Sequence, residues 1–259
     1  MSGEVGLLLE DGICTVTLRN ETRRNAINRV MWQQLAAFAA GDRAAFGRVV
    51  VVRGAGTTAF SAGADIGEFE TGRSNPAAAA QYDDLVESTC RAIERIPVPT
   101  IAMIYGPCMG AGVSLAASCD LRIASDEAFF AVPAAKIGLG YDPRGIDRFV
   151  RKFGANLARQ VLFSADKLPA TRAYELGVVQ AMAKPGDLDA VVAAAAAGMR
   201  NNAPLTLLAA KAALCAIETG DAGLRREAER LYRAADASAD YAEGRAAFAA
   251  KRPPRFRGT

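Results

Sequence analysis

Two glycine-rich segments in the first half of the chain constrain its fold more than any other feature. Residues 60–66 are FSAGADI, and residues 106–114 are GPCMGAGVS. Each segment follows a short apolar run and precedes a stretch with helical spacing, so both are predicted to be strand-to-helix turns. Small residues let another molecule approach the backbone closely, and the first amides of a helix have no intrahelical acceptor. Two such turns facing each other would direct paired N–H donors at one oxygen, which is the arrangement of an oxyanion hole.

Two other interpretations of these turns compete with this one. Glycine and alanine at a turn are also typical of tight packing without a ligand. A nucleotide-phosphate cradle is disfavoured, because neither segment has the G-x-G-x-x-G spacing and no glycine-lysine-serine or glycine-lysine-threonine sequence occurs. The residues of the two turns alone leave tight packing and an oxyanion hole open.

The hydrophobic pattern alternates between strands and helices in the first part of the chain and is helical in the last part. Residues 13–18 alternate as a half-buried strand, whereas 49–52 and 100–104 are continuous apolar runs, typical of strands covered on both faces. These features predict an α/β fold without an internal repeat or an independent second domain. Further strands are expected at 121–124, 129–132 and 178–180, and helices at 30–40, from 66, at 76–95, from 110, and from 149 through 250.

Composition excludes several classes of partner. The chain has 31 basic and 28 acidic residues and a formal net charge of +3, with no basic block, so nothing indicates binding to nucleic acid or to a membrane surface. No apolar run is long enough to span a membrane, and the N-terminus lacks a signal-peptide pattern. The five cysteines have no paired spacing, which is typical of reduced thiols, and we expect a cytoplasmic protein. Because histidine and C-x-x-C sequences are absent, we expect no metal site.

Four motifs, in order along the chain, carry a family resemblance. They are residues 24–28 (RNAIN), residues 60–66, the turn at 110–112 with Cys119 and Asp120 beyond it, and residues 241–248 (YAEGRAAF) followed by 251–253 (KRP). Together they resemble the crotonase, or enoyl-CoA hydratase/isomerase, superfamily over nearly the whole chain. The resemblance is highly specific for the fold and much less so for the reaction, since this superfamily hosts several chemistries on one site.

The resemblance implies a crotonase-like ββα spiral core over residues 1–200, which holds the acyl-CoA site. It also implies a C-terminal helical trimerisation region over residues 201–259, and an assembly that is a homotrimer or a dimer of trimers. The substrate would be an acyl-CoA thioester, with coenzyme A as part of the substrate and no separate cofactor.

The same resemblance implies which residues form the site. The thioester carbonyl would lie between the backbone N–H groups of Ala64 and Ala111, where an enolate-like oxyanion would form. Alanine is compatible with both positions because only the backbone donors are needed. The CoA moiety would lie along residues near the two turns and meet a C-terminal helix at its nucleotide end: Arg23, Ala26, Ala62, Asp65, Ile66, Phe248 and Lys251.

Two departures from the family pattern bear on the reaction. Hydratases of this family carry one glutamate shortly after the second glycine turn and another just after a proline in the next strand–loop, and the two act as base and acid around a water. In this chain those positions are Ser114 and Ala134. Neither can hold or pass a proton as a carboxylate does, so the two-glutamate hydration mechanism is not supported.

The loop at residues 138–145 (GLGYDPRG) offers substitutes for the missing glutamates. Asp142 falls where dienoyl-CoA-type isomerases of the superfamily place a catalytic aspartate. Tyr141 falls where a methylmalonyl-CoA decarboxylase places a tyrosine that orients the leaving carboxylate. The alternative for Asp142 is structural, as the cap of a helix beginning near Gly145 or the partner of Arg144. Burial beside an acyl chain would raise the pKa of Asp142, whereas pairing with Arg144 would lower it.

We therefore expect an acyl-CoA lyase or isomerase of fatty acid metabolism, for which isomerisation or decarboxylation fits better than hydration. Three alternatives stay open. They are an acyl-CoA-binding protein without catalysis, an enoyl-CoA hydratase that uses Asp142, and a trimeric scaffold with a structural role.

Overall fold

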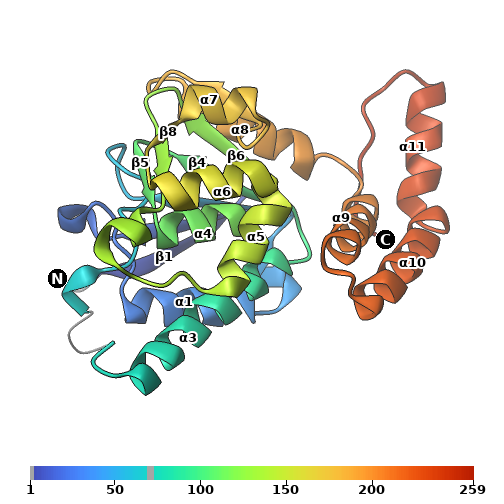
Figure 1. Cartoon of the computed structure of the whole chain (residues 1–259). Coiled ribbons are helices and arrows are strands. Elements are labelled where there is room, and N and C mark those ends of the chain that lie inside the picture. Colours follow the sequence, from blue (N-terminus) through green and yellow to red (C-terminus); the bar gives the residue numbers. More distant parts are fainter. Residues whose placement is uncertain (1–2, 69–72) are drawn as a thin grey trace.

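Two β-sheets organise the core of the chain, whose computed structural model describes residues 3–68 and 73–259 (Figure 1). All neighbouring strands are parallel except the first two of the larger sheet and the last two of the smaller one. The larger sheet has the order β1 (Glu4–Glu10), β2 (Ile13–Arg19), β3 (Val49–Gly54), β4 (Thr100–Ile104), β6 (Leu121–Ser125) and β9 (Ala181–Ala183). The smaller sheet has the order β5 (Pro107–Met109), β7 (Phe129–Ala131) and β8 (Leu168–Pro169).

The middle of the larger sheet confirms the predicted strands at 13–18, 49–52, 100–104 and 121–124. The packing of β3 explains why its run of valines does not alternate with polar residues. Val50 and Val52 pack into one apolar cluster, and Val49 and Val51 pack into a second cluster on the opposite face. The sheet is therefore covered on both faces, as continuous apolar strands require.

Several boundaries differ from the sequence prediction. The strand predicted at 178–180 is wrong, because the buried residues Val178 and Val179 direct their amides at the carbonyl of Ala173, and β9 begins only at Ala181. β1 and β5 were not predicted; β1 exposes its leucines, and β5 lies inside the second glycine-rich segment. The helix predicted from residue 66 begins as the 3₁₀ helix η3 (Ile66–Glu68), and residues 69–72 lie outside the described residues.

The helices begin where the sequence supplies caps. Asn28 accepts a hydrogen bond from the amide of Met31, and Asn75 accepts one from Ala78 with Pro76 in the first helical position. The helices predicted at 30–40, at 76–95 and from 110 are confirmed. The helices are α1 (Arg29–Ala39), α3 (Pro76–Glu94), α4 (Ala111–Ser118), α5 (Pro143–Phe153), α6 (Ala155–Ser164), α7 (Ala170–Glu175), α8 (Leu188–Arg200), α9 (Pro204–Thr219), α10 (Ala222–Asp236) and α11 (Ala239–Ala249).

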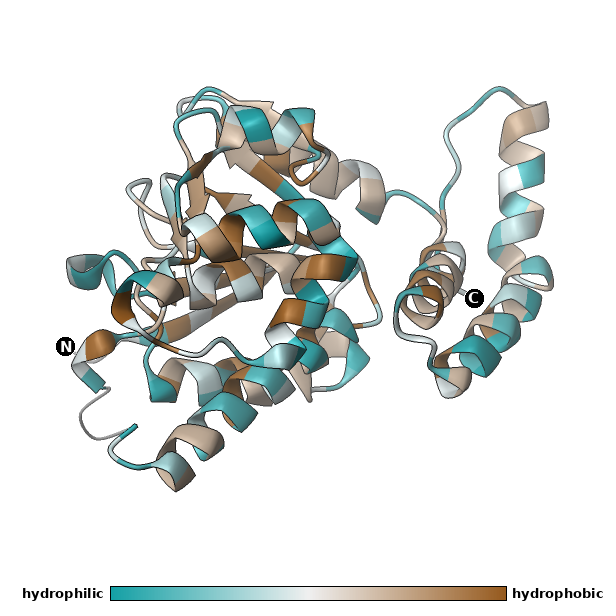
Figure 2. Cartoon of the chain, in the orientation of Figure 1, coloured by the Kyte–Doolittle hydropathy of each residue, from teal (hydrophilic) through white to brown (hydrophobic). Residues whose placement is uncertain are grey.

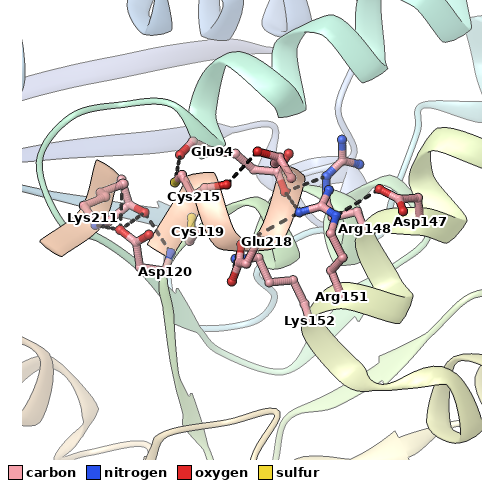
Figure 3. A network of polar contacts seen from close by, with 12 residues as sticks. Glu94, Cys119, Asp120, Asp147, Arg148, Arg151, Lys152, Lys211, Cys215 and Glu218 are labelled. Carbon is pink, nitrogen blue, oxygen red and sulfur yellow. Dashed lines mark hydrogen bonds and ion pairs between the residues drawn. The ribbon is translucent and has the colours of Figure 1, made fainter. Parts of the chain in front are cut away.

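The C-terminal helices α9, α10 and α11 lie to one side of the sheets (Figure 1). Figure 2 shows α9 as largely hydrophobic and α10 as largely hydrophilic. Polar contacts tie α9 to the core (Figure 3): the Lys211 ammonium donates to Asp120 at 2.7 Å and to the carbonyl of Val98 at 2.8 Å, and Glu218 accepts from Lys152 at 2.7 Å. Since α8 ends at residue 200 and α9 starts at 204, the predicted division at 200/201 falls in the connection between them, although its status as a domain boundary stays a prediction.

Candidate active site

The two glycine-rich turns lie against each other. The first runs beside β5, with the amide of Ser61 donating to the carbonyl of Pro107 at 3.1 Å and the amide of Met109 donating back to Ser61 at 2.9 Å. Gly63 has a φ of +101°, and a Cβ at that position would lie 3.0 Å from the Met109 carbonyl oxygen and 3.6 Å from the Ala111 nitrogen. Glycine is therefore needed at 63 both for its backbone conformation and for the contact between the turns.

The amides of Ala64 and Ala111 have no partner among the described residues, although the backbone groups on both sides of Ala64 and just before Ala111 are bonded. The carbonyl of Gly63 and the amide of Asp65, on either side of Ala64, both bond to Ile27. The amide of Gly110, just before Ala111, donates to Ala131 at 2.8 Å. These bonds fix the backbone around two unused donors, and Ala111 is the first residue of α4, where helix amides have no internal acceptor.

Both free donors lie at the wall of one cavity of about 140 Å³. Apolar side chains supply much of its surface, as a hydrocarbon chain requires. Ser114, Ala134, Tyr141 and Asp142 also lie in this wall, so the structure brings together the residues singled out by the sequence. The apolar side chains in the wall are Val86, Val132, Ile137 and Leu139.

Ser114 and Tyr141 form a pair of hydroxyls, with their oxygens 2.7 Å apart. Ser114 projects from α4, where it is buried, and Tyr141 approaches it from the loop before α5. Burial raises the pKa of the Tyr141 hydroxyl well above its ordinary value, which keeps this group protonated at neutral pH. The pair thus presents a neutral hydrogen-bonding group in the cavity wall.

Asp142 caps α5. Its carboxylate accepts a hydrogen bond from the amide of Arg144 at 2.8 Å and pairs with the guanidinium of the same residue at 2.7 Å. The side-chain hydrogen bond from Arg144 holds the pKa of Asp142 below its usual range. The structural alternative for Asp142 is therefore present, with the helix beginning at Pro143 instead of near Gly145. Asp142 nevertheless also lines the cavity. Its role in proton transfer stays a prediction.

The residues predicted to bind CoA near the turns lie in or close to the first glycine-rich turn, and two of them belong to the cavity wall. Arg23 pairs with the buried carboxylate of Asp65 at 2.5 Å, and Asp65 also accepts from the amide of Gly67 at 3.0 Å. Ala62 and Ile66 lie in the cavity wall. The Asp65 carboxylate therefore ties the Arg23 side chain to the backbone that follows Ala64. Ala26 is buried just beside this group, and the CoA contacts of all five residues stay predictions.

Phe248 and Lys251 are not brought to the cavity within one chain. Phe248 is 88 % exposed on α11, which lies on the far side of α9 and α10 from α4 (Figure 1). Neither residue belongs to the cavity wall formed by the described residues. The contact expected between these residues and bound CoA therefore stays a prediction.

A buried ion pair beside the cavity was missed by the sequence reasoning. Glu87 on α3 is 5 % exposed, lies in the cavity wall, and accepts a hydrogen bond at 2.9 Å from Arg148 on α5. The signal was available, since Glu87 stands within the buried stripe that contains Cys90 and Ile93, and Arg148 stands beside the buried residue Phe149. When two helices each carry a residue of opposite charge at a core position, the two side chains are predicted to form an ion pair.

The described residues offer neither a metal-binding cluster nor a membrane-spanning helix. The described residues contain no group of three or more histidine, cysteine, aspartate or glutamate side chains placed to hold a metal ion. Across residues 3–68 and 73–259, no helix combines the length and apolar character needed to cross a bilayer.

Comparison with known proteins agrees with the fold. The model of the enoyl-CoA hydratase/isomerase family matches residues 9–259. The chain is 36 % identical to the Mycobacterium tuberculosis protein named "Probable enoyl-CoA hydratase echA6", over 98 % of this chain and 99 % of that one. It is 30 % identical to the methylmalonyl-CoA decarboxylase of Escherichia coli, over 82 % of this chain and 81 % of that one.

Among solved structures, an enoyl-CoA hydratase/carnithine racemase from Magnetospirillum magneticum superposes with a TM-score of 0.91 at 36 % identity, covering 98 % of this chain and 96 % of the other. The family model, the Mycobacterium tuberculosis relative and the solved structure each match nearly the whole chain. On these matches, the chain belongs to the enoyl-CoA hydratase/isomerase family of the crotonase superfamily.

Proposed function

We propose that this protein binds an acyl-CoA thioester and holds the enolate of that thioester between the N–H groups of Ala64 and Ala111. The observation that carries the proposal is this pair of donors, which no acceptor in the described residues occupies, at the wall of a largely apolar cavity. A thioester oxygen that gains negative charge would supply the missing acceptor. The loss of one such donor typically raises a reaction barrier by about 3 kcal/mol.

Double-bond isomerisation or decarboxylation fits the cavity better than hydration. Hydration by the family's standard route needs two carboxylates that bracket a water, and the corresponding positions, Ser114 and Ala134, carry a hydroxyl and a methyl group. Both preferred reactions pass through an enolate and need no activated water; isomerisation moves a proton off one carbon and onto another, and decarboxylation adds one proton after loss of CO2. The decarboxylase among the relatives supports the idea that chains of this type serve such chemistry.

Tyr141 and Asp142 have distinct places in this proposal. The Tyr141 hydroxyl, held by Ser114, is placed to orient an acyl substituent by donating a hydrogen bond. Asp142 is the carboxylate that the sequence analysis assigned to proton transfer. Its oxygens are engaged by Arg144, so a substrate would have to compete with that contact.

A second candidate function is acyl-CoA binding without catalysis. The engagement of Asp142 by Arg144 favours it, because a carboxylate held in this way is a poor proton carrier. This function would need the same cavity and the same two amides as hydrogen-bond donors to the thioester carbonyl. It differs only in the absence of turnover.

We further propose a homotrimer or a dimer of trimers in the cytoplasm. The C-terminal helices expose large apolar side chains, among them Leu214, Ile217 and Tyr232, which a second chain would cover. All five cysteines are free thiols, four of them buried, which suits a reducing compartment.

A screen of acyl-CoA thioesters with mass-spectrometric detection tests the function. It includes crotonyl-CoA, a dienoyl-CoA and a malonyl-type thioester, and it measures binding and conversion separately. We expect binding of acyl-CoA, little hydration of crotonyl-CoA, and conversion of an isomerisable or decarboxylatable thioester. Binding with no conversion of any thioester would select the non-catalytic function, and rapid hydration of crotonyl-CoA would contradict the interpretation of Ser114 and Ala134.

A further inference from the structure

Three acidic side chains lie in the described wall of the cavity, and they differ in how their oxygens are used. Both oxygens of Asp83 bond to Arg73, at 2.6 and 3.0 Å. Both oxygens of Asp142 bond to Arg144. Glu87 uses only Oε2, which accepts from Arg148, while Oε1 accepts no hydrogen bond from the described residues.

The free oxygen of Glu87 lies beside the ring of Tyr141. A Cβ on Gly145 would lie 3.0 Å from Glu87 Oε1 and 2.9 Å from Tyr141 Cε1, so both groups border the space that this glycine leaves open. Gly145 is buried in the first turn of α5, where a larger residue would push the two groups apart. The hydroxyl of Tyr141 in turn contacts Ser114, which places Glu87 in the polar part of the cavity wall.

Arg148 fixes the orientation of this carboxylate. The guanidinium is almost fully buried and lies between Glu87 and Glu94, with Glu94 Oε1 3.5 Å from its Nε. Arg151 holds Glu94 from the other side at 3.2 Å (Figure 3). Because Arg148 takes Oε2 and is itself held in place, Oε1 is left beside Gly145 and the ring of Tyr141.

We propose that Glu87 is the proton-transferring carboxylate of this site, a role that rests on the proposed function. In the step, the C–H bond at the α carbon of a 3-enoyl-CoA breaks, and its proton forms an O–H bond on Oε1. The electron pair enters a dienolate whose negative oxygen is held by the N–H groups of Ala64 and Ala111. A proton then moves from Oε1, where the O–H group exchanges with solvent, to the γ carbon, which gives the conjugated 2-enoyl-CoA and introduces deuterium when the solvent is D2O. Every atom and electron is retained, so no oxidant or co-reactant is needed.

The test uses trans-3-hexenoyl-CoA as the probe and the full-length protein. Conversion is followed by the absorbance of the conjugated 2-enoyl thioester and, in D2O, by deuterium uptake in the mass spectrum. Binding is measured separately by calorimetry with hexanoyl-CoA, which has no double bond to move. The variants are Glu87→Gln, which keeps the size of the side chain, and Glu94→Gln as the matched control. Glu94 has the same residue type, lies on the same helix and contacts the same arginine, but it lies outside the cavity wall formed by the described residues.

We expect Glu87→Gln to slow conversion by at least about 100-fold, the usual contribution of a general acid–base group, with unchanged affinity for hexanoyl-CoA. Glu94→Gln keeps an oxygen that can accept from Arg148, so it is expected to slow conversion by no more than a few-fold. Conversion by Glu87→Gln within a few-fold of wild type would overturn the proposal, as would a loss confined to Asp142→Asn. If Glu87→Gln does not fold, Glu87→Asp keeps the charge and the pairing with Arg148, and its shorter side chain should reduce conversion at least about 10-fold.

Failure of the two proposals can be told apart. Wild-type protein that binds hexanoyl-CoA but neither converts the probe nor takes up deuterium would overturn the role of Glu87 and leave acyl-CoA binding intact. Wild-type protein that binds no acyl-CoA would overturn the proposed function itself.

Discussion

The hydroxyl oxygens of Tyr141 and Ser114 lie 2.7 Å apart, and each is the only hydrogen-bond partner that the described residues give the other's side-chain oxygen. The two residues come from different elements, the loop before α5 and the middle of α4. Their contact therefore links the loop before α5, which contains Asp142, to helix α4, which begins with the free amide of Ala111.

This contact predicts a measurable coupling between the two residues. Tyr141→Phe or Ser114→Ala leaves the other hydroxyl without its partner, so each single change should lower the free energy of unfolding by about 1–2 kcal/mol. The double variant should lose less than the sum of the two, because both partners are then gone. Urea unfolding of the four proteins measures the coupling, and strictly additive losses would show that the contact does not form in solution.

A proline at position 111 is predicted to remove one donor of the oxyanion hole while leaving the fold intact. Ala111 is the first residue of α4, a position where proline is well tolerated, and proline has no N–H. We expect Ala111→Pro to lower the rate constant for enolate-dependent turnover by about 100- to 1000-fold. Ala111→Ser keeps the amide and serves as the control.

The readout for this pair of variants is turnover of the best thioester from the substrate screen, with circular dichroism as a check of folding. Equal rates for Ala111→Pro and Ala111→Ser would remove the Ala111 amide from the mechanism.

Much of the site was predictable because its signals are local. Gly63, Gly110 and the alanines that follow them are set by strand-to-helix turns, which a few consecutive residues specify. The cap of α5 is also local, because Asp142 accepts from the amide of Arg144, only two positions further along the chain. Local chemistry thus predicted the two amides and the structural alternative for Asp142.

The remaining parts depend on contacts that are distant in sequence. Glu87 and Arg148 are 61 positions apart, so no short motif joins them. The strand expected at 178–180 failed for a related reason, because the apolar side chains of Val178 and Val179 are buried by a turn and not by a sheet. The places of Phe248 and Lys251 depend on assembly, which one chain does not contain.

Asp142→Asn is predicted to destabilise the protein in a pH-dependent way. The pKa of Asp142 is held below its usual value by Arg144, so its stabilising effect is present above the unfolded-state value of about 4 and is lost as the pH falls through the folded-state value. At neutral pH we expect a loss of about 1 kcal/mol or less, because asparagine still caps the helix and solvent weakens the ion pair. Unfolding free energies of the two proteins from pH 7 to strongly acidic pH should converge, and a constant difference would contradict the pairing.

The assembly prediction is tested at the exposed apolar side chains of α9. Leu214 and Ile217 are 60 % and 73 % exposed in the single chain, three positions apart on one face of the helix. If a second chain covers them, Ile217→Asp should bury an unpaired charge and dissociate the trimer or hexamer, whereas Glu229→Gln on the hydrophilic helix α10 should not. Native mass spectrometry gives the subunit number of each variant. A wild-type protein that is monomeric at micromolar concentration would contradict the prediction, and with it a contact of Phe248 or Lys251 with CoA bound to a neighbouring chain.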